Sequence, residues 1–510
     1  MKQLLCGFVF VSFSCLAQDN VLKTDAGGIA GPELFAEYCA VCHGEQLEGA
    51  AQGVALINRD LTQGDSIEAL EAVINAGVPN TGMLAWQKTL DSGKVRSLAL
   101  LIKEYRSGLV TVDLKTDFSI PSGPQDSMHH GLSVVEVTDG LDRFPYSISV
   151  LPDDSIVVTE KMHGLRRVSP AGEVSNLIKG TPDTHNDVYV MESDGIEFGS
   201  GWLLDIEAHP NYSDNGWLYL HYTERCRDCG DVMDENNPPT SRNMVVRGRI
   251  KNGVWQDEEL IWSAQEFDSN LYLDVVAGGR LAFDPEGYLF MTVGMRNMDT
   301  IQDLGTPYGK THRVHDDGRV PNDNPFYNDD GVVKTIWTYG HRSPQGLTFS
   351  VDRREVWGTE HGPRGGDEIN LLAPGGNYGW PLFSGGQNYD GTEVAHGRER
   401  SEVELQDTQL PVVEFTPSIA ISNLVAYEGD AFPDWQGDFL VGSLKAQDLY
   451  RIRLRNGVVV EQEALLEDLG RIRDIDVGES GEVYLLIEHQ GGGRIVKLVP
   501  LQAESVSTGE

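Results

Sequence analysis

The residues with the clearest chemistry in this chain are Cys39, Cys42 and His43, which form a C-x-x-C-H motif. Two thiols at this spacing can add to the two vinyl groups of a porphyrin, and the histidine that follows is then held under the iron as its proximal ligand. A disulfide, half of a zinc site and a chance match are the alternatives. We expect one covalent haem c at this motif, and with it the transfer of electrons.

A second segment supports this interpretation. Residues 81–86 (TGMLAW) resemble the loop with which small cytochromes c present their distal methionine. The resemblance implies that Met83 is the other axial ligand, which would raise the potential of the iron; a buried core methionine is the alternative. An amphipathic stretch from Val95 to Tyr105 would close a small helical domain.

The start of the chain has the pattern of a secretory signal peptide over residues 1–17. Lys2 precedes an apolar run from Leu4 to Leu16, and Ala17 ends a cleavage site of small residues. The run is too short for a membrane span, and no long apolar segment follows it. Because haem c is attached after export in bacteria, we expect a periplasmic or secreted protein without a membrane span.

Charge and the remaining cysteines narrow the possible partners. The net charge of −38 and the pI of about 4.6 argue against nucleic-acid binding, which needs a basic face, and favour basic or neutral partners. Cys226 and Cys229 form a second C-x-x-C, but Gly230 stands where haem would need histidine. In an oxidising compartment we expect a short-loop disulfide there, with a reactive redox pair as the alternative.

The 510 residues are too many for one ordinary core, so we expect at least two domains. A helical domain over 28–107 is followed by a linker over 108–131. From 132 to 501, turns with Pro, Asp or Gly repeatedly lead into alternating strands, as at 283–293. This repeat predicts a mainly β protein, a six-bladed β-propeller behind a small all-α domain, with a large sandwich or a β-helix as alternatives.

The longer domain also contains five segments rich in Gly, His, Pro and aromatic residues: 209–212 (HPNY), 279–284 (GRLAFD), 339–346 (YGHRSPQG), 359–368 (TEHGPRGGDE) and 375–381 (GGNYGWP). In this order they resemble the soluble PQQ-dependent glucose and aldose sugar dehydrogenases. The resemblance covers nearly all of residues 132–500. It implies a six-bladed propeller that holds pyrroloquinoline quinone (PQQ) and calcium, and a sugar or related alcohol as substrate.

The resemblance also implies binding residues. PQQ is a tricarboxylate, so its site needs fixed cations, and arginine suits carboxylates bidentately. The cations at the family's positions are Arg342, Lys445, Arg471 and Arg473. For each of them a solvated surface charge is the alternative. The calcium ligands implied are the backbone carbonyls of Gly362 and Pro363 at the catalytic site, and Glu368 and Tyr378 at a second, structural site.

The family pattern fails at the catalytic base. Val276 stands where the family has the histidine that takes the sugar's proton, and Met295 stands where it has the aspartate that orients this histidine. Ser200 and Ser343 likewise replace a glutamine and an asparagine. The paired loss is coherent because an orphaned buried aspartate would be costly. Four explanations remain: Asp274 serves as the base, the alignment is shifted here, the substrate differs, or the propeller only binds.

The leading hypothesis is a periplasmic quinohaemoprotein oxidoreductase. It would oxidise a sugar or related alcohol through PQQ and pass electrons singly to its own haem, and then to an external acceptor such as a soluble cytochrome or copper protein. One alternative is a non-catalytic propeller that recognises a carbohydrate or a protein beside an electron-transfer domain. Another is a calcium-dependent hydrolase, against which the four cations speak, because a lactonase needs a carboxylate-lined metal centre.

Overall fold

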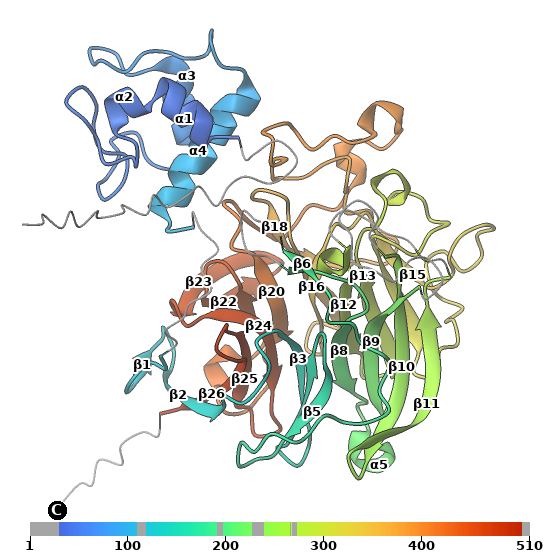
Figure 1. The fold of residues 1–510 in the computed structure, drawn as a ribbon. Coiled ribbons are helices and arrows are strands. Elements are labelled where there is room, and N and C mark those ends of the chain that lie inside the picture. Colours follow the sequence, from blue (N-terminus) through green and yellow to red (C-terminus); the bar gives the residue numbers. More distant parts are fainter. Residues whose placement is uncertain are drawn as a thin grey trace, which may run out of the picture.

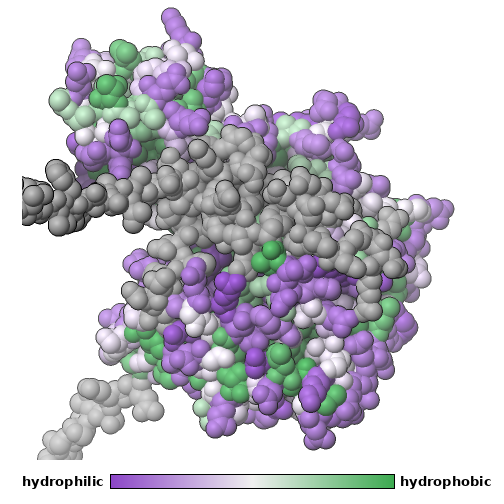
Figure 2. All heavy atoms as spheres, in the orientation of Figure 1, coloured by the Kyte–Doolittle hydropathy of each residue, from purple (hydrophilic) through white to green (hydrophobic). Residues whose placement is uncertain are grey.

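The computed structural model describes residues 30–109, 119–190, 197–226, 239–265, 267 and 273–501. The predicted signal peptide and Cys229 lie outside these ranges. The described chain forms a helical unit and a larger β unit (Figure 1). On the face shown in Figure 2, hydrophilic residues predominate over both units, in keeping with the net charge of −38. No helix in the described ranges is long and apolar enough to cross a membrane.

The helical unit packs its helices around one apolar core. Its elements are α1 (Pro32–Tyr38), α2 (Ala40–His43), α3 (Ile67–Ala76) and α4 (Ser92–Arg106). The longer two are capped, since Ser66 Oγ accepts from the Ala69 N–H at 3.2 Å and Asp91 Oδ1 accepts from the Lys94 N–H at 2.9 Å. Their buried faces place Leu98 and its apolar neighbours inside the core. The predicted all-α domain is confirmed.

The β unit is a propeller, in which the described residues form six antiparallel blades. Blade 1 contains β3 (Pro145–Val150), β4 (Ile156–Glu160) and β5 (Gly164–Val168). Blade 2 contains β8 (Leu203–Ala208), β9 (Leu218–Arg225), β10 (Ser241–Lys251) and β11 (Val254–Ser263). Blade 3 contains β12 (Gly278–Phe283), β13 (Tyr288–Val293), β14 (Lys310–His315) and β15 (Ile336–Tyr339). Blade 4 contains β16 (Pro344–Ser350), β17 (Glu355–Glu360), β18 (Asp367–Leu371) and β19 (Val413–Phe415).

The last two blades complete the ring. Blade 5 contains β20 (Ile421–Ala426), β21 (Phe439–Ser443), β22 (Leu449–Arg455) and β23 (Val458–Leu466). Blade 6 contains β24 (Arg471–Val477), β25 (Val483–Glu488), β26 (Arg494–Pro500), β2 (Gly131–Thr138) and β1 (Gln125–Asp126). Shorter elements are β6 (Tyr189–Val190), β7 (Glu197–Phe198), α5 (Tyr212–Asn215) and the 3₁₀ turn η1 (Leu273–Val276).

Blade 6 joins the two ends of the propeller sequence. Strand β2 pairs antiparallel with β26, with Leu132 opposite Pro500. The segment expected as a linker up to residue 131 therefore already contributes β1 and the first residue of β2 to this blade. The predicted six-bladed propeller is confirmed. Its ring is closed, so that blade 1 packs against blade 2 on one side and blade 6 on the other.

The innermost strands β3, β8, β12, β16, β20 and β24 contact one another in a ring around the axis. Side chains join these strands across the blade boundaries. Asp474 Oδ2 accepts from the Ile148 N–H at 2.7 Å, and Asp205 Oδ2 accepts from the Leu281 N–H at 2.7 Å. Apolar clusters fill the spaces farther out, as between blades 3 and 4. This arrangement explains why inner strands carry buried aspartates, which satisfy backbone donors that no sheet pairing reaches.

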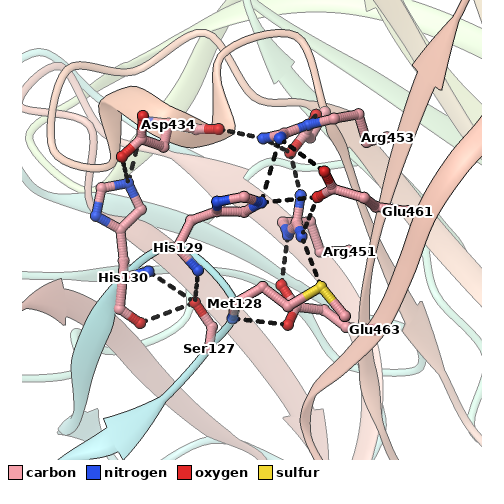
Figure 3. A network of polar contacts seen from close by, with 10 residues as sticks. Ser127, Met128, His129, His130, Asp434, Arg451, Arg453, Glu461 and Glu463 are labelled. Carbon is pink, nitrogen blue, oxygen red and sulfur yellow. Dashed lines mark hydrogen bonds and ion pairs between the residues drawn. The ribbon is translucent and has the colours of Figure 1, made fainter.

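A charged network fastens the segment before β2 to blade 5 (Figure 3). Arg451 is fully buried and ion-pairs with Asp438, Glu461 and Glu463 at 2.5, 2.9 and 2.6 Å. His129 Nε2 lies 2.7 Å from the same Glu461. The hydrogen bonds from His129 and Arg451 lower the pKa of Glu461 to about 2. Because a buried guanidinium needs its carboxylates, this network ties the segment between β1 and β2 to blade 5.

Candidate functional site

The cations expected at the PQQ site meet at one end of the propeller. Arg342 lies just before β16, and Arg471 and Arg473 begin β24. Lys445 follows β21, the second strand of its blade. All inner strands run in the same direction, so the starts of inner strands and the ends of second strands share one end of the propeller. The fold therefore brings together residues from blades 4, 5 and 6.

One carboxylate at this end is shared by three cations. Glu488 accepts from Arg473 Nε at 2.7 Å, from Arg471 Nε at 3.1 Å and from Lys161 Nζ at 3.4 Å. Burial raises the pKa of Glu488, but the three cations outweigh burial and hold this pKa well below its usual range. Two arginines against one carboxylate leave an excess of positive charge at this end of the propeller, to which Lys161 adds when it is protonated.

Two further cations add to this excess. Arg342 is buried and donates from Nη1 to the His361 carbonyl at 3.1 Å, while its Nε has no hydrogen-bond partner among the described residues. Burial lowers the pKa of Lys445 against the attraction of Glu104 and Asp367. Buried cations are costly without anionic partners. An anion with several carboxylates would supply the partner that Arg342 lacks.

Tyr146, a buried residue among these cations, could not be identified from the sequence. Its hydroxyl donates to the Gly278 carbonyl at 2.7 Å, and the guanidinium carbons of Arg280 and Arg473 lie 4.6 and 5.8 Å from its ring centroid. Lys161 Nζ lies 5.3 Å from the same centroid. Lys161 was not identified from the sequence either. Tyr146 lies at the start of an inner strand and Lys161 just after a second strand, which are the positions of the expected cofactor-binding residues in the other blades.

Lys161 has an unusual protonation state. Burial and the neighbouring Arg473 lower the pKa of Lys161 to about 7, although Glu488 opposes this change. Lys161 therefore loses its proton far more easily than an exposed lysine. A free amine in the pocket is a potential proton acceptor.

The two positions of the missing dyad lie in one apolar cluster. Its buried members are Val276, Met295, Ile301, Trp380 and Val394. The structure thus brings Val276 and Met295 together from η1 and from the loop after β13. An imidazole at one position would face a carboxylate at the other across this cluster, where neither could be solvated alone.

Asp274 is buried beside this cluster but is occupied by structural donors. Its Oδ1 accepts from Ser241 Oγ at 2.6 Å and Arg296 Nη2 at 2.8 Å. Its Oδ2 accepts from Thr223 Oγ1 at 2.5 Å and the Gly201 N–H at 2.8 Å. Four donors use the lone pairs that a base would offer to a substrate proton. This geometry argues against the prediction that Asp274 is the catalytic base.

Ser200 and Ser343 differ in their surroundings. Ser343 Oγ accepts from Gln345 Nε2 at 3.0 Å. Ser200 Oγ is buried and has no partner among the described residues, and the same holds for the indole nitrogen of Trp202. Both unpartnered groups lie just before β8, at the pocket end of the propeller. They are available to a polar ligand.

The loop after β17 presents the carbonyl groups expected to hold calcium. Gly362 and Pro363 are buried, and no donor among the described residues reaches their carbonyl oxygens. The loop is held in shape by Asp367, whose Oδ1 accepts from the Gly362 N–H at 3.1 Å. Two such oxygens fit a hard cation. In the described ranges no group of three His, Cys, Asp or Glu side chains could hold a metal by itself.

The second calcium position has a different environment. Burial and the nearby Glu360 raise the pKa of Glu368 well above its usual value. The hydroxyl of Tyr378 donates to the Leu371 carbonyl, and its ring stacks on His341 with centroids 4.7 Å apart. A cation would relieve the crowding of carboxylates, but the Tyr378 hydroxyl is already engaged.

The helical unit presents the residues expected to hold haem. Cys39 and Cys42 are free and half-buried at the junction of α1 and α2. Burial and the neighbouring Cys42 raise the pKa of the Cys39 thiol to about 11. His43 Nδ1 lies 2.8 Å from the Val54 carbonyl, which leaves Nε2 for iron. Met83 is half-buried in the loop after α3. These groups fit a covalent haem with two axial ligands.

Cys226 forms a disulfide, while Cys229 lies outside the described residues.

Two family models match the chain. The model for "Glucose / Sorbosone dehydrogenase" matches residues 142–497, and the model for "Cytochrome C oxidase, cbb3-type, subunit III" matches residues 28–102. Aldose sugar dehydrogenase YliI of Escherichia coli (strain K12) is 33% identical over 372 residues, which are 72% of this chain and 93% of that protein. Quinoprotein glucose dehydrogenase B of Acinetobacter calcoaceticus is 25% identical over 417 residues, 68% of this chain and 84% of that protein. The crystal structure of the E. coli soluble aldose sugar dehydrogenase in the apo-form matches with a TM-score of 0.61 at 31% identity, covering 72% of this chain and 100% of that one.

Proposed function

This chain belongs to the glucose and sorbosone dehydrogenase family and carries a cytochrome c domain, and we propose that it oxidises a sugar or related alcohol with PQQ and passes the electrons to its own haem c. The observation that carries this proposal is the excess of positive charge in the pocket of a chain whose net charge is −38. PQQ, when bound, supplies the acceptor for the substrate's hydride.

The chain's own residues would bind and orient. Arg342, Lys445, Arg471 and Arg473 would hold the cofactor's carboxylates, and the carbonyls of Gly362 and Pro363 would hold a calcium ion. Glu368 and Tyr378 remain our proposal for a second calcium site. The apolar cluster around Val276 would keep water from one side of the pocket. His43 and Met83 would be the axial ligands of the haem iron.

Location and electron acceptor follow from the haem. Covalent attachment of haem c in bacteria takes place after export, so we propose a periplasmic or secreted protein whose signal peptide, residues 1–17, is removed. A soluble cytochrome or copper protein would reoxidise the haem.

The decisive experiment is to load the purified protein with calcium and PQQ, offer a panel of aldoses and alcohols, and follow the haem α-band. Reduction that needs both PQQ and a substrate supports the proposal. Failure to bind PQQ, or binding without haem reduction by any substrate, contradicts it. That outcome would favour a non-catalytic carbohydrate- or protein-binding propeller, for which the apolar residues at the dyad positions, Val276 and Met295, are the supporting observation.

We propose that Lys161 accepts the proton that alcohol oxidation releases. Only the free amine can do this, so the rate of haem reduction by substrate should rise with pH through about 7, the pKa to which burial lowers Lys161. Lys161→Arg keeps the positive charge for cofactor binding but cannot deprotonate, and it should lose about 100-fold in rate with PQQ affinity retained. A Lys161→Arg protein with the wild-type rate and pH profile would contradict this role.

A further inference from the structure

The helical unit rests on the propeller through one face of α4. Ser97 lies four residues after Gly93, and Glu104 lies seven residues after Ser97, so the three share a face of the helix. Figure 1 shows α4 as the helix of this unit nearest to the propeller. The contacts it makes fall on Arg364 and on residues 385–391, which we call the docking loop.

A buried ion pair lies at the centre of this contact. Arg364 Nε and Nη2 donate to the two carboxylate oxygens of Glu104 at 3.2 and 2.9 Å, and the two side chains are only 4% and 8% exposed. The remaining Nη1 donates to the Ala30 carbonyl just before α1. Such a bidentate pair fixes both distance and orientation.

The same ion pair reaches the proposed cofactor site. Arg364 directly follows Gly362 and Pro363, whose carbonyls face the calcium position. The carboxylate of Glu104 also attracts Lys445, one of the pocket cations. A residue of the helical unit is therefore ion-paired with one cation of the propeller, Arg364, and attracts a second, Lys445.

The surfaces also fit closely. A Cβ on Gly93 would lie 2.7 Å from the Gly391 carbonyl oxygen, and a Cβ on Gly391 would lie 2.8 Å from Ser97 Oγ. Gln387 is 2% exposed, donates to the Gly93 carbonyl at 2.9 Å and accepts from Ser97 Oγ at 3.0 Å. The Ala30 N–H donates to the Tyr389 carbonyl at 2.8 Å. Glycine on both sides permits this approach, and the polar groups inside it are paired.

We propose that the haem domain is docked on the propeller by this face of α4. Electrons then pass from the cofactor site to the haem across this fixed interface, and the domain does not move freely on its linker. The electron route rests on the proposed function; the docking does not. Oxidation of one alcohol to a carbonyl releases two electrons and two protons. The haem iron takes one electron at a time, from Fe(III) to Fe(II), and an external oxidised cytochrome or copper protein removes each. A fixed interface keeps the tunnelling distance constant between these steps.

Two variants test the docking by different means. Gly93→Ala places a methyl group against the Gly391 carbonyl, although alanine is the better helix former. Glu104→Gln keeps the shape but leaves Arg364 and Lys445 without their carboxylate. Glu45→Gln, an exposed acid of the same unit, is the matched control. Each protein is examined by hydrogen exchange and mass spectrometry, with peptides that contain Ala30 and the docking loop.

We expect faster exchange at Ala30 and in the docking loop for Gly93→Ala and Glu104→Gln, and no change for Glu45→Gln. With calcium, PQQ and substrate, haem reduction should slow by about tenfold or more in the two interface variants. For Gly93→Ala, which changes no residue near the proposed cofactor site, a small dye that takes electrons directly from the propeller should be reduced at the wild-type rate. Unchanged exchange would overturn the docking, and faster exchange with unchanged haem reduction would overturn the electron route. No dye reduction by the wild type contradicts the proposed function, while exchange still decides the docking.

Discussion

Replacing Arg342 with methionine is expected to raise the thermal stability of the cofactor-free protein and to lower its affinity for PQQ by about 100-fold or more, since each hydrogen bond to a charged group contributes about 1.5–3 kcal/mol. Arg342 is 7% exposed, its Nε is unpartnered, and among the described residues it has no ion-pair partner. A methionine of similar length removes this buried charge and keeps the packing. The residue would then be retained for its ligand at the expense of stability.

Arg473→Met is the matched comparison. This guanidinium donates to Glu488 at 2.7 Å, so its removal weakens a buried ion pair and should destabilise the cofactor-free protein. It should also weaken PQQ binding. Thermal unfolding without cofactor and a fluorescence titration with PQQ separate the two effects. If both variants shift the melting temperature in the same direction, the unpaired charge of Arg342 does not destabilise the cofactor-free protein.

The combined variant Val276→His with Met295→Asp is expected to oxidise sugars about 100-fold faster than the wild type, or more, because it restores a general base. Both positions lie in the same buried apolar cluster, at 5% and 4% exposure. Met295→Asp alone buries a carboxylate without a partner and should destabilise the protein by about 3 kcal/mol.

A histidine at position 276 should recover part of that loss, with a coupling free energy of about 1–3 kcal/mol between the two substitutions. Denaturant unfolding of the two single variants and the combined variant measures this coupling independently of activity. Strictly additive losses would show that the two side chains do not meet. Coupling without faster oxidation would show that another group accepts the substrate's proton. Lys161 is the group that we propose for this role.

Much of the fold could be predicted because its signals are local. Turns followed by alternating strands recur along residues 132–501, and this pattern together with the family resemblance led to six blades. The end of the linker could not be predicted, since β1 is a strand only because β2 lies beside it. Blade 6 pairs Leu132 with Pro500, and no short window of sequence contains that contact.

The candidate site divides in the same way. The family resemblance identified Arg342, Lys445, Arg471 and Arg473, and the fold brings their segments to one end. Tyr146 and Lys161 escaped notice, because a lone tyrosine or lysine has no motif and gains its meaning only when blade 1 closes against blade 6. The prediction of Asp274 as the base could not take its four donors into account, since these come from separate segments.

The haem motif shows what sequence by itself determines. Cys39, Cys42 and His43 lie within five residues of the chain, so their types and spacing were enough to predict a covalent haem. How the helical unit packs on the propeller was decided only by tertiary structure. Glu104 and Arg364 are far apart in the chain, and both are buried only because α4 packs on the docking loop. A motif carries its chemistry when its atoms are neighbours along the backbone; charge balance, burial and docking depend on residues that only folding makes neighbours.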